Sequence, residues 1–321
     1  MTASAVRRKR TMLALRVGTT LAAFAYVAAR VDLRAVGSAL VRVSPLAFLV
    51  ACVSTALNLV VGSVRWRILL QAYGAPHVPT LGSLVRLNYI GFFYNTCLPG
   101  GVGGDVVRGY ASRAAFGDEG VTGAGAVVLV DRVLGLVGLL LVVAFTATAF
   151  PLPVAESNHV TAISLAGIAV SAGAIVAIAI GRSLAPRLPA FARKYAENLP
   201  AIKHWGPFGV AILLSLVTQS VVAWTGHVIV ASLAPTVALT DSLVVVPLAM
   251  ATAFLPFLVG GTGAREEVFA RLYGPLGVPG SDAVAASLLV WFTQIVVALV
   301  GGLLPLPHAA AAKPETNKAN G

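Results

Sequence analysis

Two polar segments interrupt an otherwise apolar sequence, and both combine glycines with ionisable side chains. The first runs from Asn95 to Arg108 and contains Leu-Pro-Gly-Gly-Val-Gly-Gly-Asp-Val-Val-Arg. The second runs from Gly260 to Glu267 and reads Gly-Gly-Thr-Gly-Ala-Arg-Glu-Glu. Charges near or inside a membrane are energetically costly, so such residues are functional candidates by default. We therefore look for a binding site in these two segments.

The first segment predicts a broken helix that could hold an anion. Pro99 cannot donate a backbone hydrogen bond, and the glycines permit backbone angles closed to other residues, so a helix should restart near Gly104. Its free N–H groups would suit a phosphate, although Asp105 could cap them instead. Arg108 is on the same face as Asp105 and could pair with it or with a lipid phosphate. The sequence leaves both possibilities open: a headgroup site, or a broken helix pair with an internal ion pair.

The second segment has similar components but a different charge order. Glu267 and Arg271 have the i, i+4 spacing of a helical ion pair. These charges belong to a site if the segment lies in the membrane, and they are ordinary solvated charges if it is a surface turn. Asp131 and Arg132 open another apolar run, either as an interfacial anchor or facing the first turn. The candidate substrate-binding residues are Asn95, Gly100, Gly101, Gly103, Gly104, Asp105, Arg108, Asp131, Arg132, Gly260, Gly261, Gly263, Arg265, Glu266 and Glu267.

The elements that must position these residues are membrane-spanning helices. Of the 321 residues, 58% are hydrophobic and 11% are charged, against about 25% charged in a soluble domain. Each of six uncharged runs reaches the roughly 20 residues that a spanning helix needs. The sequence shows no alternating β-barrel pattern. We expect an all-α integral membrane protein with about six full spans, the first of them in the apolar run 11–29 that Arg16 interrupts. The uncharged runs are 43–64, 133–155, 157–181, 206–234, 242–264 and 283–312.

Charge placement predicts how these spans are oriented. The basic residues at 7–10 and in the loop 182–204 mark cytoplasmic segments, whereas the loops 151–159 and 235–241 lack Lys and Arg and should be external. This topology also explains the net charge of +11 better than nucleic-acid binding does. We expect a protein of the cytoplasmic (inner) membrane with both termini in the cytoplasm. Arg30, Arg34 and Arg42 argue mildly against this orientation, because they fall on the predicted outer side.

Alternation of the spans requires each glycine-rich segment to belong to a re-entrant helix pair, at 84–115 and at 242–274. The chain then divides into two structural repeats of opposite orientation, 11–155 and 156–305, followed by a polar, disordered tail at 306–321. Together they form one polytopic domain, 1–321. Inverted repeats are common in transporters, whose sites form where discontinuous helices meet near the midplane.

The chain resembles a known family at four places: Arg65 to Leu70, Asn95 to Arg108, Asp131-Arg132, and Gly260 to Glu266. These segments are similar to the lysylphosphatidylglycerol synthase transmembrane-region family, a group of flippase-like integral membrane proteins, and the resemblance extends over roughly 12–305. In the best-known members this region adjoins a soluble aminoacyl-transferase domain and is held to move the charged lipid between leaflets. We expect no such domain here, so the synthase activity is not carried over.

The resemblance implies a lipid flippase or transporter-like protein for a phospholipid or a polyprenyl-linked headgroup. Two other readings remain open: a membrane-embedded transferase acting on a lipid-linked substrate, and a non-transporting partner of a separately encoded glycosyl- or aminoacyl-transferase. No metalloprotease, nucleophile-elbow or Walker-type motif is present. Cys52 and Cys97 have no metal-binding spacing. We expect no cofactor, no metal and no catalytic residue; transport would then be passive or ion-coupled. The expected partners are membrane lipids and a separate transferase, with no nucleic acid.

Overall fold

The computed structural model describes residues 33–97, 102–150, 157–187, 201–254 and 261–305. Within these residues the regular secondary structure is helical. Four helices are long and apolar enough to cross a membrane: α3 (Pro45–Ala72), α6 (Gly120–Ala149), α9 (Trp205–Leu233) and α12 (Gly280–Leu303). They match four of the predicted runs, and the prediction of a multi-pass all-α membrane protein is confirmed. The first predicted span, in 11–29, lies outside the described residues.

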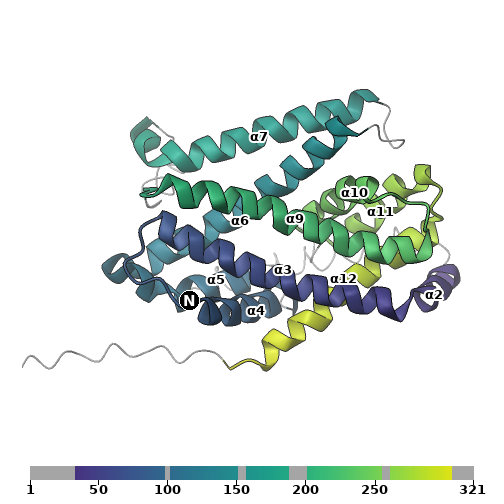
Figure 1. Ribbon diagram of the computed structural model, residues 1–321, viewed down its shortest axis with the longest axis horizontal. Coiled ribbons are helices and arrows are strands. Elements are labelled where there is room, and N and C mark those ends of the chain that lie inside the picture. Colours follow the sequence, from purple (N-terminus) through teal and green to yellow (C-terminus); the bar gives the residue numbers. More distant parts are fainter. Residues whose placement is uncertain (1–32, 98–101, 151–156, 188–200, 255–260, 306–321) are drawn as a thin grey trace, which may run out of the picture.

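Helices α3 and α9 form the antiparallel centre of the molecule. The backbone N–H groups of Lys203 and His204 donate to the Ala72 carbonyl oxygen at 2.8 and 3.0 Å, so α9 begins where α3 ends. At the opposite end, Ala51 of α3 shares an apolar cluster with Val230 of α9. The two helices run side by side along the long axis of the molecule (Figure 1).

The first glycine-rich segment joins α4 (Leu81–Cys97) to α5 (Gly103–Ala111). The His77 N–H, just before α4, donates to the Ala115 carbonyl oxygen, just after α5, at 3.3 Å. The two helices therefore start and finish at the same end of the molecule, as a re-entrant pair requires. A Cβ atom added at Gly104 would lie 1.8 Å from the Gly91 carbonyl oxygen. Only glycine permits this contact between the backbones of α4 and α5.

The second glycine-rich segment joins α10 (Leu239–Ala251) and the 3-10 turn η3 (Thr252–Phe254) to α11 (Ala264–Tyr273). The Tyr273 hydroxyl, at the end of α11, donates to Ser242 Oγ, near the start of α10, at 3.0 Å. This pair also begins and ends at one end of the molecule. Figure 1 shows α10–α11 at the opposite end from α4–α5.

The last long helix of each half packs against the helix pair of the other half: α6 contacts α10, and α12 contacts α4. Helix α7 (Ser157–Leu184) covers α6, and α2 (Leu33–Arg42) covers α12. The remaining 3-10 turns are η1 (Arg113–Glu119), η2 (Ala185–Arg187) and η4 (Gly274–Leu276). Arg42, one of the arginines on the predicted outer side, forms an ion pair with Asp282 at 2.6 Å. Its charge is therefore balanced locally.

Candidate functional site

Five charged residues from three helices meet beside the first glycine-rich turn; we call them the first-half network. They are Arg65 of α3, Asp105 and Arg108 of α5, and Asp131 and Arg132 of α6. Asp131 is at the centre, because it accepts from Arg65 Nε at 2.8 Å and from Arg108 Nη2 at 2.9 Å. All three of these side chains are buried. Charge-assisted bonds of this kind compensate for the cost of burying the ions.

Asp105 holds the more exposed part of this network. It forms an ion pair with Arg132, lies 3.8 Å from Arg108 Nη1, and accepts from Asn95 Nδ2 at 3.3 Å. The prediction that Asp105 caps α5 is wrong. Asn95 of α4 satisfies the first turn instead, since its Oδ1 accepts from the Gly104 N–H at 2.8 Å. Asp105 is therefore left to bind arginines rather than backbone.

Arg65 ties the network to the second half of the chain. Its Nη1 donates to Ser215 Oγ at 3.2 Å and to Thr218 Oγ1 at 3.3 Å, both on α9. Each hydroxyl gives its own proton to a carbonyl oxygen of α9, at 3.0 and 2.9 Å, and so can accept from the guanidinium. The network thus lies where the two central helices meet the helix pair α4–α5.

Arg108 retains binding capacity within this network. Its guanidinium carbon lies 4.2 Å from the centre of the Trp66 ring, which favours the cation. Its Nε is buried and has no hydrogen-bond partner among the described residues. The five charged side chains of the network, three arginines and two aspartates, add up to a formal charge of +1. Asp131 is about 16 Å along α6 from its first residue.

The second glycine-rich turn leads to a smaller and closed arrangement. Arg265 Nη2 and Nε contact Glu266 Oε1 at 2.6 and 3.1 Å, and Ser287 Oγ of α12 bonds both side chains. Glu266 Oε2 accepts from the Gly263 N–H at 2.5 Å. The two side chains are 2% and 0% exposed, and their charges cancel. We call this the second-half pair.

The other predicted residues of the second segment do not join that pair. Glu267 and Arg271 form the predicted i, i+4 ion pair at 2.5 Å, but the Arg271 side chain is 66% exposed. Gly261 and Gly263 shape the turn, with φ angles of 74° and 86° that favour glycine. Gly103 begins α5. The candidates Gly100, Gly101 and Gly260 lie outside the described residues.

The structure brings together six predicted residues in the first half: Asn95, Gly104, Asp105, Arg108, Asp131 and Arg132. Sequence reasoning missed Arg65, Trp66, Ser215 and Thr218 there, and Ser287 in the second half. Arg65 and Trp66 are easily taken for interfacial anchors. The available signal was an arginine a full two turns inside the end of a long apolar helix, where an internal partner is needed.

The first-half network is suited to binding an anionic oxygen, because it offers surplus positive charge and an unused N–H donor beside the start of a helix. Both aspartates are ion-paired, so neither resembles an unengaged general base. Within the described part of the chain, no group of three or more His, Cys, Asp or Glu side chains could hold a metal ion.

Comparison with known proteins assigns the chain to a family. The family model described as the lysylphosphatidylglycerol synthase TM region matches residues 12–302, which include every residue of both charged clusters. A search among curated proteins gives no match. The chain therefore belongs to the lysylphosphatidylglycerol synthase transmembrane-region family, and it is a multi-pass membrane protein tied to lipid handling.

Proposed function

We propose that this protein moves a phosphate-bearing lipid between the two leaflets of the membrane, and that the first-half network binds the headgroup. The observation that supports this proposal is the buried Nε of Arg108, which has no hydrogen-bond partner among the described residues, in a network whose five charged side chains add up to +1. A phosphodiester carries one negative charge at neutral pH. Its binding would bring the local charge to zero and give Arg108 an acceptor.

The proposed ligand class is set by the phosphate rather than by the rest of the headgroup. Phospholipids and polyprenyl-linked lipids both carry phosphate, and both fit the same arginine chemistry. Asp105 and Arg132 are the partly exposed members of the network, with side chains 19% and 31% exposed. We infer that a headgroup approaches past this pair and reaches Arg108 behind it.

The packing of the helices supports a transport mechanism. We infer two inverted repeats in which α3 to α6 correspond to α9 to α12, because α4 packs on α12 in the way that α10 packs on α6. Such repeats allow a central site to open alternately to each side. The proposed cytoplasmic side is the end where α3 finishes and α9 begins, which includes Lys203. Basic residues collect on that side of spanning proteins.

The experiment that tests this proposal is lipid translocation in reconstituted liposomes. Fluorescent phosphatidylglycerol and phosphatidylcholine are placed in both leaflets, and the fraction protected from an external quencher is followed with time. We expect protein-dependent movement of lipid, slowed at least tenfold by Arg108→Met and less by Asp105→Asn. Arg187→Gln removes an exposed arginine outside the network and serves as the control. Equal movement with and without protein, for every lipid tested, would overturn the proposal.

The same liposomes distinguish the transferase and partner readings. Translocation leaves the lipid chemically unchanged, so chromatography of the extracted lipid should give only the starting material. A new lipid product that disappears with Asp105→Asn would indicate a transferase. Movement that requires an added second protein would indicate a partner subunit.

A further inference from the structure

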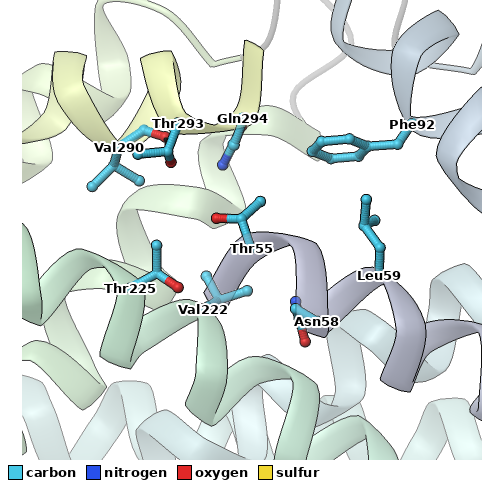
Figure 2. A pocket seen from close by; sticks show the side chains of 9 residues that line it. All are labelled: Thr55, Asn58, Leu59, Phe92, Val222, Thr225, Val290, Thr293 and Gln294. Atoms are coloured by element: carbon cyan, nitrogen blue, oxygen red, sulfur yellow. Dashed lines mark hydrogen bonds between the residues drawn. The ribbon is translucent and has the colours of Figure 1, made fainter. Parts of the chain in front are cut away.

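A pocket of about 80 Å³, lined by both polar and apolar side chains, lies between the two halves of the molecule, among the middle turns of the spanning helices. Thr55 and Asn58 of α3, Thr225 of α9, and Thr293 and Gln294 of α12 line it, with apolar side chains completing the wall. Figure 2 shows these side chains around one space, with the hydroxyls of Thr55 and Thr293 turned toward it. Polar residues in the middle of spanning helices are energetically costly, so they are functional candidates by default.

The pocket is midway between the two charged clusters. Asn58 precedes Arg65 by seven residues on α3, and Thr225 follows Thr218 by seven residues on α9. Gln294 follows Ser287 by seven residues on α12. Seven residues are two helical turns, so each pair shares a helix face and is separated by about 10 Å. Polar positions therefore follow one another from the first-half network, through the pocket, to the second-half pair.

The threonines offer the pocket acceptors and no donors. Thr55, Thr225 and Thr293 each donate their single hydroxyl proton to a carbonyl oxygen three or four residues earlier in the same helix, at 2.7–2.9 Å. Each hydroxyl oxygen can therefore offer only its lone pairs to a ligand. An anion such as phosphate would face these lone pairs and is disfavoured, in contrast to the arginine-rich network two turns away.

The two carboxamides can add further acceptors. Asn58 Oδ1 is buried and has no hydrogen-bond partner among the described residues. A half-turn of the amide brings this oxygen to the pocket, where its Nδ2 is now drawn (Figure 2). Gln294 Nε2 contacts only the weak acceptor Met250 Sδ, at 3.7 Å, so its amide is also free to turn. The pocket can then supply five neutral oxygens from three helices.

We propose that this pocket binds a small monovalent metal cation, with Na⁺ as the fitting ion. Hard cations take oxygen ligands, and divalent ions usually require carboxylates. No carboxylate lines the pocket among the residues the structure describes. Its volume is more than one water needs, so it has room for a small ion that keeps some of its waters. The site joins helices from both halves, so occupancy would hold those halves together.

The cation site has an electrostatic relation to the network. The formal charge of +1 on the five charged side chains of the network, about 10 Å away, opposes a cation in the pocket. A phosphate bound at Arg108 would cancel that charge and strengthen cation binding by about tenfold. Linkage then requires the cation to strengthen headgroup binding equally. This coupling rests on the proposed function, whereas the cation site itself does not.

The site is tested by ²²Na⁺ binding to the purified full chain in detergent, with choline chloride holding the ionic strength constant. We expect one saturable Na⁺ per chain. Thr55→Val and Thr293→Val keep the side-chain shape but remove an oxygen, and each should weaken Na⁺ binding at least tenfold. Thr55→Ser keeps the hydroxyl and should bind within threefold of wild type. Thr148→Val removes an exposed hydroxyl with the same helical hydrogen bond and is the matched control.

Each outcome of that experiment decides something. Absence of saturable Na⁺ binding to folded wild type would mean that the pocket holds water only, and would overturn the site. Equal binding by Thr55→Val and wild type would overturn it as well. A thermal melt of each variant shows whether a loss of binding is a loss of folding. Lipid translocation without Na⁺ binding would overturn the cation site but not the proposed function. Na⁺ binding without lipid translocation would overturn the proposed function but not the cation site.

Discussion

The two glycine-rich turns lead to arginines and carboxylates at similar positions, yet the resulting clusters differ in kind. In the first half, five charged side chains from three helices add up to a formal charge of +1, and part of the network is exposed. In the second half, adjacent residues of one helix neutralise each other and are fully buried. We therefore propose the first-half network, and not the second-half pair, as the binding site.

The hydrogen-bond partners of the two central carboxylates explain why the two clusters differ. Glu266 receives bonds from Arg265, Ser287 and the Gly263 backbone, which together use both carboxylate oxygens. Such a pair fixes the start of α11 against α12 and leaves little for a ligand. Asp131 instead divides its two oxygens between Arg65 and Arg108, neither of which is fully satisfied by it. The first cluster can therefore accept a further anion.

The difference between the two clusters is tested most strongly by removing one charge from the second-half pair. Glu266→Gln leaves Arg265 buried without a counter-ion, so the free energy of unfolding should fall by about 3–5 kcal/mol. A thermal melt in detergent measures the effect. The double variant Arg265→Met/Glu266→Leu should recover most of the loss, because it removes both charges. A melting temperature for Glu266→Gln close to wild type would show that the pair is not a structural lock.

The substitution Gly104→Ala should change the position of α5 without changing the charges of the network. It therefore tests the effect of position alone. The added methyl group collides with the Gly91 carbonyl oxygen, so α5 must shift and we expect a loss of about 1–3 kcal/mol in unfolding free energy. Lipid translocation should fall although all five charges remain. Gly125→Ala is the control, since its Cβ would meet open space. Full activity of Gly104→Ala would mean that the close approach of α4 and α5 is unnecessary.

Removing a charge from the open network should cost less stability than removing one from the closed pair. Arg108→Met leaves Asp131 bonded to Arg65 and brings the net charge of the network to zero. We expect a loss of about 1–2 kcal/mol in unfolding free energy, smaller than for Glu266→Gln. The same thermal melt compares the two variants. A larger loss for Arg108→Met would assign the structural role to the first cluster instead.

The smallest effect should come from the exposed pair beside the closed one. Glu267→Gln breaks the contact with Arg271, whose side chain is mostly exposed. Exposed helical ion pairs contribute about 0.3–0.5 kcal/mol, so the unfolding free energy should change by no more than that. Comparison with Glu266→Gln in the same melt isolates the effect of burial for two neighbouring glutamates. A loss above about 1 kcal/mol would show that Glu267 has an internal role.

Much of the fold could be predicted because apolar length is a local property of the sequence. The four long helices each overlap a predicted run, α9 begins and ends within one residue of its run, and α5 begins one residue before the predicted restart. The Glu267–Arg271 pair was also predictable from spacing. These features depend on residues within one helix.

The network could be predicted only in part, because its bonds join helices that are far apart in sequence. Arg65 and Asp131 are 66 positions apart, and Arg65 and Thr218 are 153 positions apart. Sequence spacing does not say that these helices pack together. Asp105 was wrongly predicted to cap α5 for the same reason, since the cap comes from Asn95 on the neighbouring helix.

The central claim is that the first-half network binds lipid phosphate and the second-half pair does not. A measurement of lipid binding tests this claim most directly. Native mass spectrometry can count short-chain phosphatidylglycerol on wild type, Arg108→Met and Arg265→Met/Glu266→Leu. We predict that Arg108→Met binds the lipid at least tenfold more weakly, whereas the double variant binds it as wild type does. Undiminished binding by Arg108→Met, together with a loss in the double variant, would contradict the account.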